Sequence, residues 1–174
     1  MKIENKNRIE NFEEEIRLEI RNKTFLNETT LNKYVKWHAL SLINFVDCRF
    51  EEIDFLGIPI NVCKFKNSEF NHFSFRKCQI SKCTFENCRI MNSDLTRAEF
   101  DDSSFINCEF LKSELAASDF WSCEFSETTF KNSRFDVIVA RDIKCWQSNQ
   151  LIKIKKSSNF ANILKDLNLA SSKG

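Results

Sequence analysis

The sequence predicts a repeat fold in which the chain turns a corner every five residues. Two periodic positions support this prediction. Of the 20 positions at multiples of five between 45 and 140, 19 hold Phe, Ile or Leu. Two residues before each of them lies a mostly small position, with Ala, Cys, Ser or Thr at 15 of 20. A helix repeats about every 3.6 residues and a strand about every 2, so neither element alone produces a strict period of five.

Composition limits the class of protein. The chain has 174 residues, 42% of them hydrophobic, and a net charge of +1, which suits one folded domain with no strong attraction to nucleic acid or anionic membrane. Only 2 residues are Gly, so we expect few left-handed turns and no glycine-rich phosphate loop. The chain shows neither a signal peptide nor a run of ~20 apolar residues, which predicts a cytoplasmic protein.

The segment from Cys83 to Phe110, CTFENCRIMNSDLTRAEFDDSSFINCEF, closely resembles the pentapeptide-repeat proteins. Their motif is a small residue, any residue, Leu or Phe, and two polar residues, and the resemblance extends over residues 43–143. It implies an all-β fold: a right-handed quadrilateral parallel β-helix, a pentapeptide-repeat solenoid with four pentapeptides in each of about five coils. The small residue and the central Phe or Leu are then expected to point inward.

In such a coil, residues 20 apart in sequence form columns. We expect two inward ladders, Phe45–Phe65–Phe85–Phe105–Phe125 and Phe50–Phe70–Ile90–Phe110–Phe130. Two outward columns are also expected: Asn67, Asn87 and Asn107 should hydrogen-bond along the stack, and Arg49, Glu69, Arg89 and Glu109 should form ion pairs.

The 8 cysteines are interpreted as small, buried apolar residues. Their spacing matches no zinc motif, and a reducing cytosol disfavours disulfides between stacked pairs. We expect at most one or two thiols to react in the native protein, Cys145 first because it alone is not at the small position. The other seven hold that position: Cys48, Cys63, Cys78, Cys83, Cys88, Cys108 and Cys123.

The repeat needs a cap at each end, because open coils expose apolar core and unpaired edges. We therefore divide the chain into a capping segment (1–40), the β-helix (41–147) and a tail with a short amphipathic helix (148–174). In the first segment, Ile9, Phe12 and Ile16 have helical spacing, whereas Ile16, Leu18 and Ile20 alternate as in a strand, and the sequence does not decide between these. Gly57 and Pro59 indicate one distorted corner.

In the tail, Ser157 or Ser158 is the expected N-cap of the helix. An apolar stripe follows at i, i+3, i+4 and i+7, formed by Phe160, Ile163, Leu164 and Leu167. A helix this short is marginal alone. The stripe therefore either covers the coil end or meets its copy in a homodimer, and both alternatives stay open.

The sequence contains no recognisable catalytic constellation. Its 2 histidines are His38, in the expected cap, and His72, at an outward repeat position. No nucleophile, base and orienting group can be assembled by spacing, and no cofactor or metal motif is found. We therefore expect a protein that is not an enzyme and that uses no cofactor and no metal.

What remains for function is the surface. Residues 41–147 carry 17 acidic and 13 basic side chains, a net charge of −4. Four carboxylates gather on one wall around an outward tryptophan, and we take these five residues as partner-binding candidates: Glu99, Asp101, Asp102, Asp119 and Trp121. The alternative is a chance cluster in which Trp121 only covers a coil edge.

These features predict a non-enzymatic scaffold that presents a rigid wall to a protein partner, as an inhibitor or immunity-type protein does. The sequence does not identify the partner, and we expect neither direct nucleic-acid binding nor membrane association. The resemblance implies an alternative, a DNA-mimicking protein that binds type II topoisomerase (gyrase) and protects it from quinolones. That alternative calls for a strongly acidic rod, whereas a net charge of −4 is modest.

Overall fold

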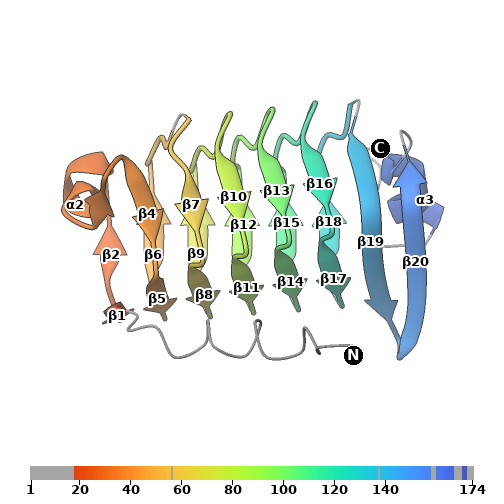
Figure 1. Ribbon diagram of the computed structural model, residues 1–174, viewed down its shortest axis with the longest axis horizontal. Coiled ribbons are helices and arrows are strands. Elements are labelled where there is room, and N and C mark those ends of the chain that lie inside the picture. Colours follow the sequence, from red (N-terminus) through yellow and green to blue (C-terminus); the bar gives the residue numbers. More distant parts are fainter. Residues whose placement is uncertain (1–17, 56, 137, 158–159, 167–169, 172–174) are drawn as a thin grey trace, which may run out of the picture.

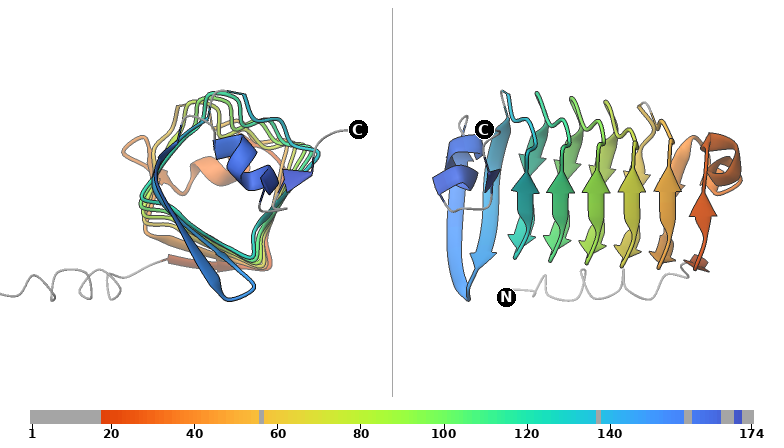
Figure 2. Two further views of the ribbon diagram at one scale, coloured as in Figure 1. Left: turned by 90° about the vertical axis from the view of Figure 1, so that its right-hand side faces the viewer. Right: turned by 180° about the vertical axis from the view of Figure 1, so that it is seen from behind.

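The computed structural model shows a parallel β-solenoid of about five coils with a helix near each end (Figure 1). It describes residues 18–55, 57–136, 138–157, 160–166 and 170–171. Viewed along its axis, the coil has four walls (Figure 2). The predicted quadrilateral β-helix is therefore confirmed. No helix in these ranges is long and apolar enough to cross a membrane.

Strands in register form three of the walls. Wall 1 holds β4 (Ala39–Ser41), β7 (Ile60–Asn61), β10 (Gln79–Ser81), β13 (Glu99–Asp101) and β16 (Asp119–Trp121). Wall 2 holds β1 (Leu18–Arg21), β5 (Ile43–Val46), β8 (Lys64–Lys66), β11 (Thr84–Glu86), β14 (Ser104–Ile106) and β17 (Glu124–Ser126). Wall 3 holds β2 (Thr24–Phe25), β6 (Arg49–Glu51), β9 (Glu69–Asn71), β12 (Arg89–Met91), β15 (Glu109–Leu111), β18 (Thr129–Lys131) and β21 (Ala170–Ser171). Wall 4 consists of isolated bridges, Asp54–Ser74–Asp94–Glu114–Arg134.

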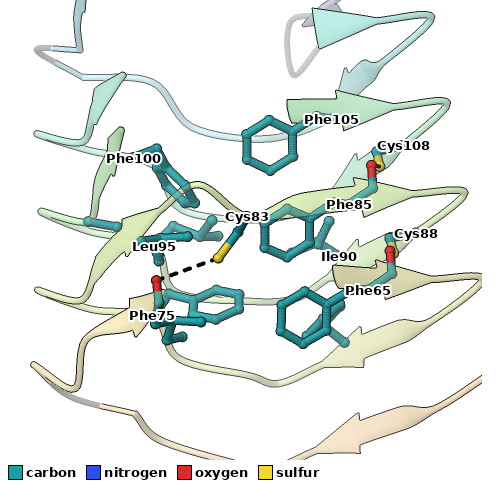
Figure 3. Packing of buried hydrophobic residues seen from close by; sticks show 14 of the residues in the cluster. Phe65, Phe75, Cys83, Phe85, Cys88, Ile90, Leu95, Phe100, Phe105 and Cys108 are labelled. Atoms are coloured by element: carbon teal, nitrogen blue, oxygen red, sulfur yellow. Dashed lines mark hydrogen bonds between the residues drawn. The ribbon is translucent and has the colours of Figure 1, made fainter. Parts of the chain in front are cut away.

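The core is a set of phenylalanine ladders inside the coils. Along wall 2 the rings of Phe45, Phe65, Phe85, Phe105 and Phe125 stack at centroid distances of 5.1, 4.9, 4.9 and 5.1 Å, with nearly parallel planes. Figure 3 shows three of these rings one above another. The predicted register of 20 residues per coil is confirmed, because Phe85 pairs with both Phe65 and Phe105. Each ring is shielded from water by the next, so the stack buries apolar area that a single coil leaves exposed.

The two predicted outward ladders are also present. The Nδ2 of Asn107 donates to Oδ1 of Asn87 at 2.8 Å, and Asn87 donates to Asn67 at 3.0 Å. On wall 3, Glu69 lies 3.3 Å from Arg49 and 3.9 Å from Arg89, which in turn lies 3.3 Å from Glu109. Each of these exposed pairs contributes little to stability, but together they place complementary side chains of successive coils next to each other.

The corners contradict the expectation of few left-handed turns. Every fifth described residue from Leu42 to Asn132 has a positive φ, and all of them except Gly57 are non-glycine. The expectation was wrong because it assumed that only glycine suits such corners. Here each left-handed residue can use its backbone N–H across coils, as Asn87 does at 2.9 Å to Ile106 O and Lys82 at 2.9 Å to Asp101 O. These bonds offset a cost of about 1–2 kcal/mol per left-handed residue.

The predicted distortion is not seen at Gly57 itself, although Leu56 in the same corner lies outside the described residues. Gly57 has φ 73°, and Lys77 one coil later has φ 58°. In both corners the next residue closes the same turn, with Ile58 N and Cys78 N each 2.9 Å from the carbonyl oxygen three residues earlier. The next two coils repeat this turn at Ala98 and Ser118, whose backbone N–H groups donate to Leu95 O and Leu115 O at 3.0 and 3.2 Å, so residues other than glycine also form this corner.

At the N-terminal end, the stack starts before residue 41. β1 pairs with β5 and β2 pairs with β6, so residues 18–20 are strand rather than helix; Ile9, Phe12 and Ile16 lie outside the described residues. Helix α2 (Glu28–Asn32) then buries Leu31 against the core, with Asn27 Oδ1 accepting from Thr30 N as its N-cap. A hairpin of β3 (Val35–Lys36) and β4 extends wall 1 beyond the first coil.

At the C-terminal end, β19 (Val139–Gln147) crosses walls 1 and 2, and β20 (Gln150–Ser157) pairs with it in antiparallel fashion. Helix α3 (Phe160–Asp166) closes the coil, because Phe160 and Leu164 are fully buried and the Phe160 ring lies 5.8 Å from that of Phe125. The helix thus covers the coil end of its own chain. Ser157 ends β20, and Ser158 lies outside the described residues, as does Leu167; a homodimer through this helix stays a prediction.

Candidate functional site

The candidate residues lie on wall 1, in the strands β13 and β16. In a strand the residues on either side of an inward one point outward. Phe100 and Phe120 are buried, so Glu99 and Asp101 flank the first and Asp119 and Trp121 flank the second. The register pairs Glu99 with Asp119 and Asp101 with Trp121. The structure therefore brings four of the five predicted residues together on adjacent coils.

These four residues border a hollow of 260 Å³ in wall 1. Its floor is made by short outward residues of the preceding coils and by the strand backbone, and Trp121 stands at one side with 46% of its surface exposed. Asp102 is not part of this lining. It occupies the left-handed corner between walls 1 and 2, with φ 49°, and its backbone N–H donates to Trp121 O at 2.9 Å.

The hollow is electrostatically unbalanced. Partial burial, and then the charge of Glu99, raises the pKa of Asp119 above its usual range. Gln79 Nε2 donates to Glu99 Oε2 at 3.4 Å, but no described lysine or arginine forms an ion pair with Glu99, Asp101 or Asp119. The hollow therefore carries an uncompensated negative charge, although stacked like charges destabilise a sheet slightly.

The other walls are built differently, and wall 3 gives the contrast. Its Glu109 lies 2.7 Å from Lys131 and 3.3 Å from Arg89, and the hydrogen bond from Lys131 is the main cause that lowers the Glu109 pKa. Lys66 and Glu86 pair at 2.9 Å on wall 2. Opposite charges thus meet between coils at these positions of walls 2 and 3, whereas like charges stack at the hollow.

The sequence analysis missed one neighbour of this site. Arg141 follows Trp121 in the same outward column, and its guanidinium lies over the Trp121 ring, 5.4 Å from the centroid. The 20-residue spacing would have identified it. Trp121 is therefore held by a cation–π contact on one side and is open toward the hollow.

The structure also shows a second surface, at the N-terminal end of wall 1 where it meets wall 2, that the sequence analysis did not identify. The β3–β4 hairpin turns at Trp37 and His38, both left-handed (φ 54° and 58°), and Trp37 is 96% exposed. Figure 2 shows this hairpin projecting beyond the outline of the coils. Beside it lies a groove of 640 Å³, which has an apolar floor and lysines at its rim: Leu18, Lys33, Tyr34, Lys36, Trp37, Ala39, Ser41, Leu42 and Ile43.

The cysteines form no comparable site. All eight are buried free thiols, and Cys145 takes the place of phenylalanine at the inward position opposite Phe125; that Cys145 reacts first stays a prediction. Burial raises the pKa of Cys145 to about 11 and that of Cys123 to about 12. Inward thiols and hydroxyls donate to nearby carbonyls, for example Cys123 Sγ to Trp121 O at 3.3 Å, which explains why Cys, Ser and Thr share this position.

The histidines lie apart from one another. His38 is in the hairpin turn, and His72 is exposed at a left-handed corner with φ 49°. Within the ranges that the structure describes, no group of three or more His, Cys, Asp or Glu side chains is placed to hold a metal ion.

Three comparisons relate this chain to known proteins. The family described as the pentapeptide repeat region matches residues 58–135. A search of curated protein sequences finds no match. Among solved structures, a pentapeptide repeat protein (Rfr23) from the cyanobacterium Cyanothece 51142 is similar at 10% identity, with 75% of this chain and 86% of that chain covered and a TM-score of 0.41. Full-length QnrB1, a plasmid-mediated fluoroquinolone resistance protein, is similar at 10% identity, with 88% and 98% covered and a TM-score of 0.30.

Proposed function

Because this chain is a pentapeptide-repeat protein, built as a rigid scaffold, we propose that it acts through its surface as a non-enzymatic protein-binding scaffold. Wall 1 is its binding surface, and a basic segment of a protein is its partner. An inhibitor or immunity-type role is one form of this function, since a rigid wall that occupies a basic site on another protein blocks that site.

The observation that carries the proposal is the contrast between the walls. On walls 2 and 3, Glu86 and Glu109 each pair with a lysine. On wall 1, Glu99 and Asp119 stack without such a partner among the described residues, beside an exposed tryptophan. Uncompensated charge attracts a partner of opposite charge and raises the association rate. A half-exposed tryptophan ring can be buried against the partner, which removes water from its surface.

The test reverses the charge of the hollow. The variant Asp101→Lys with Asp119→Lys should keep or raise the melting temperature, because it removes stacked like charges. It should weaken binding of a basic partner at least about tenfold. Capture from native lysate, quantified by mass spectrometry, compares this variant with wild type and with Glu51→Lys plus Glu52→Lys, which makes the same change of net charge on another side of the coil.

A protein retained by wild type and by the Glu51/Glu52 control but lost from the Asp101/Asp119 variant supports the proposal. If every retained protein binds the Asp101/Asp119 variant equally well, wall 1 is only a solvated face. The gyrase-binding alternative stays a prediction of the family resemblance. A DNA-supercoiling assay with a quinolone tests it separately, and absence of protection removes it.

A further inference from the structure

Wall 1 has three zones along the coil axis. At its N-terminal edge lies the groove beside β3 and β4, with Lys33 and Lys36 at its rim and Trp37 projecting from the turn. At β13 and β16 lies the acidic hollow with Trp121. The outward positions of β4, β7 and β10, where the groove and the hollow approach each other, are all uncharged: Ala39, Ser41, Pro59, Asn61, Gln79 and Ser81.

Protein interfaces commonly have few charged residues at their centre and more at their rim, and wall 1 has this distribution. The two charged zones are also opposite in sign. Lys33 and Lys36 form no ion pair with a described carboxylate, just as Glu99, Asp101 and Asp119 form none with a described base. One wall therefore carries both an acidic surface with a tryptophan and a basic surface with an apolar groove.

We propose that a second copy of this chain packs on wall 1, antiparallel and face to face, about a two-fold axis between β7 and β10. The proposal rests on the proposed function, because it names a partner for the same acidic hollow. It concerns wall 1 and not the C-terminal helix, whose Phe160 and Leu164 are buried against their own coil.

The order of strands in the wall shows why this symmetry fits. From the N-terminal edge it runs β3, β4, β7, β10, β13, β16, and β19 and β20 continue it beyond the six strands of the contact. An axis between β7 and β10 exchanges β7 with β10, β4 with β13, and β3 with β16. The uncharged centre then meets itself, and the edge with Lys36 and Trp37 meets the strand that carries Asp119 and Trp121. Because the interface is isologous, every such contact is made twice.

The same axis keeps like charges apart at the corner between walls 4 and 1. Arg97 and Lys77 are the basic residues of that corner column, which also holds Gly57. Across the two-fold axis, Lys77 of one copy faces the Gly57 coil of the other copy. Arg97 faces the other copy's β4 coil, from which Trp37 projects. A cation facing an indole is a favourable contact.

The contact spans six strands, which at a strand spacing of about 4.8 Å is about 24 Å along the axis and the width of one wall. That is at the small end for a stable complex. We therefore expect a weak dimer whose dissociation constant rises with salt, since its ends are charged.

The experiment is sedimentation velocity over a concentration series at low and high salt. Wild type should dimerise at low salt, and the dimer should weaken as salt is added. The acid-reversed variant (Asp101→Lys, Asp119→Lys) and the base-reversed variant (Lys33→Glu, Lys36→Glu) should each dimerise at least about tenfold more weakly. An equimolar mixture of the two should restore association, because in the mixed dimer each charged zone again meets its opposite.

Two control variants change net charge equally without touching wall 1: Glu51→Lys with Glu52→Lys on the side of wall 3, and Lys144→Glu with Lys153→Glu, which pair with each other where β19 and β20 continue wall 2. Both should dimerise as wild type does. A wild type that stays monomeric at every concentration overturns the proposal, as does a dimer indifferent to both reversals or a mixture that does not reassociate. If wild type is monomeric but captures a lysate protein that the acid-reversed variant does not capture, the dimer is refuted and the proposed function still stands.

Discussion

Replacing Val62 by asparagine should stabilise the protein, although valine is the more apolar residue. Val62 sits at a coil corner with φ 54°, a conformation in which a β-branched side chain is strongly disfavoured and asparagine is tolerated. Its backbone N–H donates to Ser81 O at 2.9 Å, a bond that the substitution keeps. The matched reverse change is Asn132→Val, at an exposed corner with φ 52°.

The two substitutions differ mainly in burial. A left-handed residue with a Cβ costs roughly 1–2 kcal/mol, and the half-buried Val62 side chain loses roughly 0.7 kcal/mol of apolar burial. Val62→Asn should therefore raise the free energy of unfolding by about 0.5–1 kcal/mol. Asn132→Val recovers little burial and should lower it by about 1–2 kcal/mol.

Urea unfolding followed by circular dichroism measures both changes, and each kcal/mol shifts the melting temperature of a chain this long by about 2–4 °C. Opposite signs confirm that the corners are left-handed and that their strain is a real energetic cost. If Val62→Asn destabilises while Asn132→Val has no effect, side-chain burial governs the corners and the reasoning is wrong.

Two further predictions concern the core and the walls. Phe85→Ala removes a ring stacked at 4.9 Å on both sides and should cost about 3–5 kcal/mol, whereas His72→Ala at an exposed corner should stay within about 0.5 kcal/mol; equal losses in urea unfolding would mean that the register is wrong. The pH dependence of stability should separate Asp119→Asn from Glu109→Gln. Burial and Glu99 raise the pKa of Asp119, so its ionised form destabilises the fold, and Asp119→Asn should gain stability at neutral pH that disappears as the pH falls below the ordinary aspartate range. Lys131 lowers the pKa of Glu109, so Glu109→Gln should lose stability at neutral pH and match wild type once the pH has fallen through the Glu109 pKa; melting curves from pH 3 to 7 with the same sign for both variants contradict this account.

The candidate site was predictable as far as it depends on the repeat. Once columns are spaced by 20 residues, Glu99 must pair with Asp119 and Asp101 with Trp121, and the structure has both pairs. Asp102 was grouped with them by sequence proximity, but the corner turns it out of the hollow. Proximity along the chain does not place a corner residue on the wall that precedes it.

The groove beside Trp37 could not be predicted in the same way. It is formed by residues from β1, the hairpin and the start of wall 2, so it depends on how a non-repeating segment joins the first coil. Short segments of this kind have weak local preferences, and tertiary packing decides their conformation.

The sequence by itself determined the fold, the inward and outward faces, the coil register and the two outward ladders. It could do so because a strict five-residue period repeated over some 100 residues leaves one arrangement that turns the repeated phenylalanines inward. The tertiary structure alone decided the conformation of the corners, where hydrogen bonds between coils hold ordinary residues in a left-handed conformation that their local preferences disfavour. It also decided that the C-terminal helix covers its own coil, because an amphipathic stripe shows that a helix must pack but not on what.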